Sequence, residues 1–273
     1  MGHVRGDINP NQRTMNTDET GAPDVVLEAS HLTKSFSGFM AVNDVSIQVK
    51  KGSIHALIGP NGAGKTTTFN LLTKFIQPTS GTIRFMGRDI TREQPTEIAR
   101  MGLVRSFQIS AVFPHMTALE NVRLAVQKRH GDWLNFLYSS RRNSQYDDES
   151  MELLTTVGLG SYAYDPASEL SYGRKRTLEL ATTLALEPKI LLLDEPMAGM
   201  AHEDIDRVAD IIRDIGRNRT ILMVEHNLSV VSTLCTTITV LARGSVLAEG
   251  DYQTVAADER VIEAYIGTRP AHV

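Results

Sequence analysis

The sequence predicts an α/β protein with a parallel core sheet, a helical insertion and a separate antiparallel layer of strands. Apolar runs of strand length alternate with helical patterns in the order strand, loop, helix, helical block, strand, helix, strand, which is typical of a parallel core. The helical block covers about residues 110–186 and therefore interrupts that core. Two early runs, 25–32 and 41–49, flank a turn-like segment and predict the antiparallel layer.

The other elements follow from apolar runs and turn residues. A helix pattern follows the glycine-rich run 59–64, with Phe69, Leu72 and Phe75–Ile76 at helical spacing. Further helices are expected over 202–216, where Ile205, Val208, Ile212 and Ile215 share one face, and over 258–267. Strands are expected within 53–58, 81–87, 190–196, 220–226, 237–244 and 245–250, the last two as a closing hairpin.

Composition limits the classes of function. The 273 residues amount to roughly 1.8 domains at about 150 residues each, too few for two complete nucleotide-binding domains. A net charge of −4 argues against a nucleic-acid binder that works through bulk positive charge. With 41% hydrophobic and 22% charged residues, wholesale disorder is excluded. The single cysteine, Cys235, and the lack of a membrane-spanning apolar run or a signal-peptide core predict a cytosolic chain that reaches a membrane only through a partner.

Residues 59–66 match the phosphate-binding pattern G-x-x-x-x-G-K-[ST] at every fixed position. Glycines let backbone N–H groups turn around phosphate oxygens, and the following helix directs its N-terminus at the same oxygens. Lys65 adds a positive charge at the β- and γ-phosphates, and the Thr66 hydroxyl suits Mg²⁺. The candidate nucleotide-binding residues of this segment are Asn61, Gly62, Gly64, Lys65, Thr66 and Thr67.

Two carboxylates follow the apolar run 190–193. Asp194 is the candidate metal-side carboxylate, acting through water, and Glu195 is positioned to orient or deprotonate the attacking water. His226 follows another core strand and is expected to contact the γ-phosphate and the water. The alternatives are a solvated Asp-Glu pair and a surface histidine.

Residues 170–176, LSYGRKR, identify a family because they resemble the LSGGQ signature of ATP-binding cassette (ABC) ATPases, with Tyr172 and Arg174 as departures. Ser171 is expected to cap the helix that runs from Gly173 to about residue 186. The resemblance implies that Ser171 and Gly173 serve the ATP of a second subunit in a head-to-tail dimer. It also implies a RecA-like core, an antiparallel β subdomain and an inserted helical subdomain.

The resemblance assigns roles to further residues. Phe36 stands where the family carries an aromatic residue that stacks on adenine, although alone it would be taken for a core residue. Gln108 matches the glutamine that touches Mg²⁺ or the water and reports ATP to the transport partner. Ala201 stands where the family has an aspartate or asparagine and can make no side-chain hydrogen bond. The alternatives are compensation by His202 or Asp204 and weaker communication between the two sites.

The runs ARMGLVRSFQ, LSYG and VIEAYIGT resemble the LivG-type ATPases, which power import of branched-chain amino acids, urea and short amides. The likeness covers 25–268, leaving tails at 1–24 and 269–273. It implies ATP and Mg²⁺, two multi-spanning permeases, a second ATPase (self or paralogue), indirectly a periplasmic or extracellular solute-binding protein, no nucleic acid, and the cytoplasmic face of the inner membrane. The alternatives are a soluble mechanical ABC ATPase and the ATPase of an exporter such as that of lipopolysaccharide. The apolar run 133–138 either contacts the permease or lipid, or packs within the helical subdomain.

Overall fold

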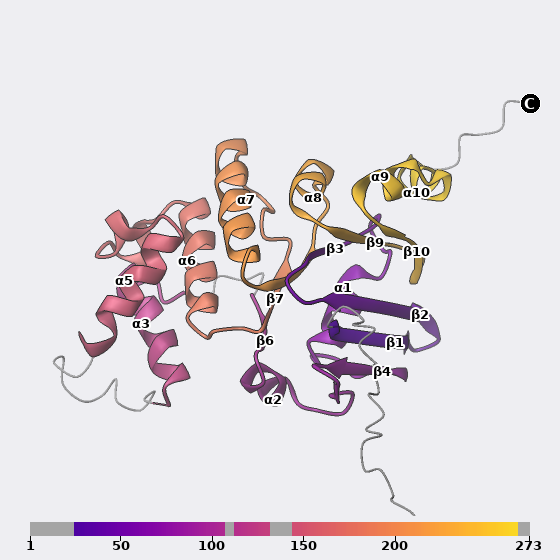
Figure 1. Cartoon of the computed structure of the whole chain (residues 1–273), viewed down its shortest axis with the longest axis horizontal. Coiled ribbons are helices and arrows are strands. Elements are labelled where there is room, and N and C mark those ends of the chain that lie inside the picture. The colour runs from indigo at the N-terminus through magenta and orange to yellow at the C-terminus, as the bar shows by residue number, and fades with distance from the viewer. Residues whose placement is uncertain (1–24, 107–111, 132–143, 267–273) are drawn as a thin grey trace, which may run out of the picture.

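The computed structural model describes residues 25–106, 112–131 and 144–266. Within these ranges the chain forms a small sheet, a larger sheet and a group of helices to one side of the larger sheet (Figure 1). The expectations for the terminal tails, for Gln108 and for the apolar run 133–138 lie outside the described residues. No helix in the described residues has the length and apolar content needed to cross a membrane.

The small sheet is the predicted antiparallel layer. Its strands are arranged in the order β2-β1-β4-β5. β1 and β2 are longer than the apolar runs suggested, because they extend to a tight turn at Ser37–Gly38, where both residues have positive φ. The bounds are β1 Val25–Phe36, β2 Phe39–Lys50, β4 Ser80–Phe85 and β5 Arg88–Asp89.

The larger sheet has six strands in the order β10-β9-β3-β8-β7-β6, and all of its pairs are parallel except β10 with β9. Every residue of β3, β7 and β8 is buried, as expected for a parallel sheet covered on both faces. The predicted core strands and the closing hairpin are confirmed. The bounds are β3 Ile54–Ile58, β6 Leu103–Arg105, β7 Ile190–Asp194, β8 Thr220–Val224, β9 Thr237–Ala242 and β10 Ser245–Gly250.

Helices cover the faces of this sheet. α3, α5 and α6 form the helical unit seen at the left of Figure 1, and α7 carries the predicted apolar face, with Val208, Ile212 and Ile215 buried and Ile205 half-buried. Alternate strand residues join two cores: Leu191 faces the helical unit, and Leu192 faces α1 and the small sheet. The bounds are α1 Lys65–Leu72, α2 Pro95–Arg100, α3 Ala118–Arg129, α5 Asp147–Thr156, α6 Tyr172–Leu184, α7 His202–Gly216, α8 Leu228–Leu234, α9 Tyr252–Ala257 and α10 Glu259–Ile266.

The expectation that the first helix continues through Phe75 and Ile76 is wrong. α1 ends at Leu72, and Lys74 adopts a left-handed φ of 61°. The Lys74 ammonium then donates to the Thr91 carbonyl, a long-range contact that turns the chain out of the helix. Phe75 is therefore 50% exposed instead of packing on the helix face.

Two titratable side chains, half-buried Cys235 and buried His55, lie away from the strand ends that carry the candidate site. The Cys235 thiol lies 3.8 Å from Met223 Sδ, and burial raises its pKa to about 12, so it stays protonated. His55 on β3 is buried, and its Nε2 lies 2.7 Å from Thr239 Oγ1, whose hydroxyl donates to Glu249. Burial lowers the pKa of His55 to about 4.

Stability is expected to depend on pH through His55. Because its pKa is below that of an unfolded histidine, the unfolded chain binds a proton first, and stability falls as pH drops from about 6.5 towards 4. Between pH 7 and pH 5 this linkage amounts to about 2 kcal/mol. His55→Gln keeps an amide donor for Thr239 but does not titrate, so its urea-unfolding free energy should change less over that interval. Equal changes in wild type and variant would contradict the assignment.

Candidate nucleotide site

The glycine-rich loop 59–66 joins β3 to α1, and two of its glycines are required by close backbone contacts. A Cβ on Gly59 would lie 2.1 Å from the Leu241 carbonyl oxygen, and one on Gly64 would lie 2.6 Å from that of Ala41. Both glycines also have positive φ. Larger residues would therefore push the loop away from β9 and β2, which hold it from behind.

Lys65 is folded against this loop. Its ammonium donates to the carbonyl oxygens of Gly59 at 2.7 Å and Pro60 at 3.0 Å, and the residue is only 8% exposed. Burial lowers the pKa of Lys65, whereas the negative charge of Glu195 raises it, which places these two charges within electrostatic reach. Of the other predicted residues here, Asn61, Gly62 and Thr66 are exposed, and Gly64 and Thr67 are half-buried.

The arrangement fits a polyphosphate. α1 begins at Lys65 without a side-chain cap and without an acidic residue in its first turn, so its first N–H groups face the loop uncapped. The glycine backbone, a lysine charge and a helix N-terminus together form an anion site. The Thr66 hydroxyl and the Asp194 carboxylate are oxygen donors of the kind that Mg²⁺ prefers.

The two predicted carboxylates and the predicted histidine lie at the carboxyl ends of two neighbouring strands, β7 and β8. Asp194 ends β7 opposite Val224 on β8, and His226 follows two residues later, so Asp194, Glu195 and His226 share one sheet edge. Asp194 is 3% exposed, Glu195 is half-buried and His226 is exposed. Glu195 has a left-handed φ of 45° and donates its N–H to the Val224 carbonyl, which fixes the turn after β7.

Two charged residues at this edge, one half-buried and one buried, were missed by sequence reasoning. Arg105, at the end of β6, pairs with the Asp194 carboxylate. Glu225 is 1% exposed and accepts backbone N–H bonds from Met197 at 3.3 Å and from His226 at 3.0 Å. Its carboxylate therefore ties the turn after Glu195 to the histidine. In the sequence, each of these residues directly follows an apolar run. That pattern alone does not distinguish a charged residue with a partner inside the fold from one exposed to solvent at a strand end.

The signature segment shows the expected helix cap. Ser171 is the N-cap of α6, and its Oγ accepts the Arg174 N–H at 3.4 Å, so this prediction is confirmed. The Tyr172 hydroxyl donates to the Ala198 carbonyl at 3.1 Å, which links α6 to the loop after Glu195. Among the described residues no hydrogen bond or ion pair joins Ser171 to the loop 59–66, and Figure 1 shows α6 well apart from α1.

Ala201 caps α7 without a side-chain hydrogen bond, as expected for alanine. Asp204 instead lies against the signature helix, since a Cβ on Gly173 would be 2.4 Å from its Oδ2. His202 is exposed. A negative charge thus lies directly beside Gly173, and Asp204 contacts α6 of its own chain.

Phe36 is not a core residue, so that alternative is wrong. Its side chain is 45% exposed at the tip of the β1–β2 hairpin, and Lys34 Nζ lies 5.1 Å from its ring centroid. The same hairpin contacts Gly64 through Ala41. An exposed ring near the phosphate loop is compatible with the predicted stacking on adenine, which stays a prediction.

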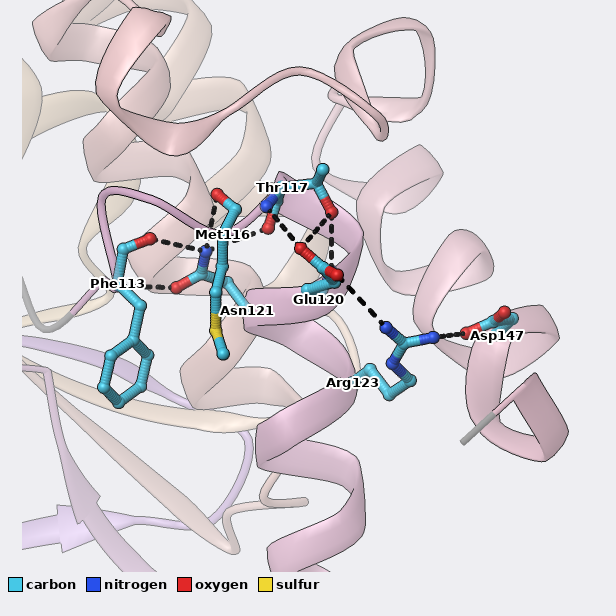
Figure 2. Close-up of polar contacts among 7 residues, drawn as sticks. All are labelled: Phe113, Met116, Thr117, Glu120, Asn121, Arg123 and Asp147. Atoms are coloured by element: carbon cyan, nitrogen blue, oxygen red, sulfur yellow. Dashed lines mark hydrogen bonds and ion pairs between the residues drawn. The ribbon is translucent and has the colours of Figure 1, made fainter. Parts of the chain in front are cut away.

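An apolar groove of about 700 Å³ lies between the sheet edge at β6 and the helical unit. Its wall includes Phe113, which is 56% exposed and follows Gln108 by five positions in the sequence. Figure 2 shows how buried Asn121 holds the loop that follows Phe113. The Asn121 side chain accepts the N–H of Phe113 at 2.7 Å and donates to the Thr117 carbonyl at 2.9 Å. Thr117 also caps α3 in a reciprocal pair with Glu120.

In the larger sheet β3 leads through the glycine-rich loop into α1, and β7, separated from β3 by β8, ends at Asp194 and is followed by Glu195. This arrangement defines a phosphate-loop nucleotide-binding protein. The family model described as ABC transporter matches residues 42–198, and the model described as branched-chain amino acid ATP-binding cassette transporter matches residues 245–271. The chain therefore belongs to the ATPases of ABC transporters, with a C-terminal segment of the branched-chain amino acid transporter type.

Curated and solved relatives agree with this assignment. The chain is 39% identical over 250 residues to the high-affinity branched-chain amino acid transport ATP-binding protein BraF of Pseudomonas aeruginosa, covering 89% of this chain and 98% of the relative. It is 36% identical over 252 residues to LivG of Escherichia coli, with the same coverage. It is similar to a crystal structure of the ADP conformation of an ATP-binding cassette of an ABC transporter, with a TM-score of 0.77, 29% identity, and coverage of 89% of this chain and 99% of that one. The predicted fold class and ATPase activity are confirmed.

Proposed function

We propose that the chain is the ATP-hydrolysing subunit of an ABC importer for a small polar solute, with a branched-chain amino acid as the first candidate. The observation that supports this proposal most directly is that the phosphate loop with Lys65 and the strand end at Asp194–Glu195 belong to the same sheet. The curated relatives named above, which are branched-chain amino acid transport proteins, support the solute class, as does the C-terminal family match. Urea and short amides remain within the proposed solute class.

The proposed mechanism relies on positioning and electrostatics. Lys65 and the α1 N-terminus hold the β- and γ-phosphates, and Asn61, Gly62, Gly64 and Thr67 complete that contact. Thr66, Asp194 and Gln108 would hold Mg²⁺, which neutralises phosphate charge when bound. Phe36 stacks on adenine.

Hydrolysis depends on the shared sheet edge. Glu195 orients the water and accepts its proton, and His226 contacts the γ-phosphate. Ser171 and Gly173 of a second subunit complete the site. Because Tyr172 bonds to Ala198 in the same chain, the signature helix and the turn after Glu195 are linked within each subunit.

We propose that the groove between β6 and the helical unit receives a permease. Its lining is predominantly apolar and its wall carries the exposed ring of Phe113, which suits an apolar helix of a partner. The full assembly would contain two multi-spanning permeases and a second ATPase (self or paralogue) at the cytoplasmic face of the inner membrane. A solute-binding protein would act on it indirectly.

The test is a pull-down of tagged Glu195→Gln protein from gently solubilised membranes of the source cell with ATP, followed by mass spectrometry. We expect two multi-spanning permeases and a second ATPase. Lys65→Ala, which is expected not to bind ATP, is the matched control and should retain fewer partners. Recovery of soluble partners or nucleic acid alone would overturn the transporter assignment and leave the ATPase chemistry.

A further inference from the structure

Arg105 occupies an unusual position between two parts of the proposed site. Its guanidinium pairs with the Asp194 carboxylate and donates from Nη1 to Asn70 Oδ1 at 2.6 Å. Arg105 is 12% exposed and Asp194 is 3% exposed, so the pair is largely shielded from water. A charge pair at such burial interacts more strongly than one at the surface.

The guanidinium is also held by aromatic rings and lines the groove. Its Cζ lies 5.1 Å from the ring centroid of buried Phe69 and 5.3 Å from that of exposed Phe75. Arg105, Phe75 and Thr73 all line the groove proposed for the permease. One side chain therefore spans from the groove to the metal-side carboxylate.

Within the described residues, Arg105 Nε is buried and has no hydrogen-bond partner. Nη1 donates to Asn70 and Nη2 donates to Asp194, so two of the three guanidinium nitrogens have a hydrogen-bond partner among the described residues and Nε does not. A partly satisfied guanidinium is less firmly held than a fully bonded one, because movement forfeits fewer hydrogen bonds. The side chain is thus suited to exchange one partner for another.

Resting on the proposed function, we propose that Arg105 is a positioning residue that opposes Mg²⁺ at Asp194. The guanidinium neutralises the buried carboxylate when no metal is bound. The guanidinium would either occupy a carboxylate oxygen of Asp194 that Mg²⁺ needs or lie beside the ion as a like charge, and both would weaken Mg²⁺ binding. Because Arg105 also lines the groove, the residue that opposes Mg²⁺ at Asp194 is itself part of the surface proposed to receive the permease.

The test measures Mg²⁺ dependence without turnover. Binding of a fluorescent, non-hydrolysable ATP analogue is followed at pH 8 while Mg²⁺ is titrated. Arg105→Met, which removes the charge but keeps an apolar stem, should lower the Mg²⁺ concentration for half-maximal binding roughly tenfold. Arg105→Gln removes the charge but keeps a donor for Asp194, so it should shift the same way if Arg105→Met fails to fold. Arg105→Lys retains the charge and should stay near wild type.

Lys128→Met is the matched control, because Lys128 lines the same groove but makes no contact with Asp194 in the described residues. It should leave the Mg²⁺ titration unchanged. An unchanged or increased Mg²⁺ requirement in the uncharged Arg105 variants overturns this proposal alone. Failure of the wild-type chain to bind the analogue at any Mg²⁺ concentration would instead overturn the proposed function.

Discussion

Glu195→Gln is expected to reduce steady-state ATP turnover by about 10²- to 10⁴-fold while leaving ATP binding intact, because an amide of the same shape cannot accept the proton of the attacking water. Glu195 is half-buried at the sheet edge, and its backbone is fixed by Val224. The substitution therefore changes the proton acceptor and leaves the turn in place. Phosphate release and nucleotide binding should be measured on the same preparation.

Glu203→Gln provides the control for the Glu195 experiment. Glu203 is exposed in the first turn of α7 and lies outside the proposed site, so its variant should hydrolyse ATP at the wild-type rate. Normal turnover in Glu195→Gln would remove this residue from the role of general base. Loss of ATP binding in that variant would show that Glu195 acts mainly on the loop, through its charge near Lys65.

Lys65→Ala is expected to fail one step earlier, at binding. The ammonium supplies the one full positive charge within the loop 59–66, and it also bonds to the carbonyl oxygens of Gly59 and Pro60. Removing it sacrifices a charge-assisted contact to phosphate and loosens the loop, so ATP affinity should fall by roughly 100-fold or more. Isothermal titration with ATP and Mg²⁺ measures this directly.

The exposed Lys51→Ala serves as the comparison for Lys65→Ala, since it removes the same charge outside the loop. Its ATP affinity should match wild type. Thermal melting without nucleotide shows whether Lys65→Ala still folds. A folded Lys65→Ala protein that binds ATP normally would contradict the phosphate role of this lysine.

Much of the candidate site was predictable because its signals are local. The phosphate loop and the strand that ends in Asp194 are contiguous patterns, and the Ser171 cap depends on a neighbour three positions away. Arg105 and Glu225 could not be found this way, because their partners Asp194 and Met197 are distant in sequence. Their roles depend on strand order, which spacing alone does not give.

The fold shows the same division. Long periodic segments such as α7 were predicted with their bounds, because the apolar face repeats over several turns. The short elements α2, β6 and α8 were not predicted, since segments of three to seven residues depend on tertiary packing for their stability. The early end of α1 likewise follows from the Lys74 bond to Thr91, which belongs to another part of the chain.

The phosphate loop is packed against backbone from a distant, later part of the chain. The loop contacts Leu241 through Gly59, and Gly244 donates its N–H to the Ala63 carbonyl at 3.0 Å. Contacts between such distant positions close long loops and are entropically costly, so they form late in folding. During synthesis the N-terminal half therefore emerges from the ribosome without a formed nucleotide site. The growing chain gains that site only when the β9–β10 hairpin has emerged and docked.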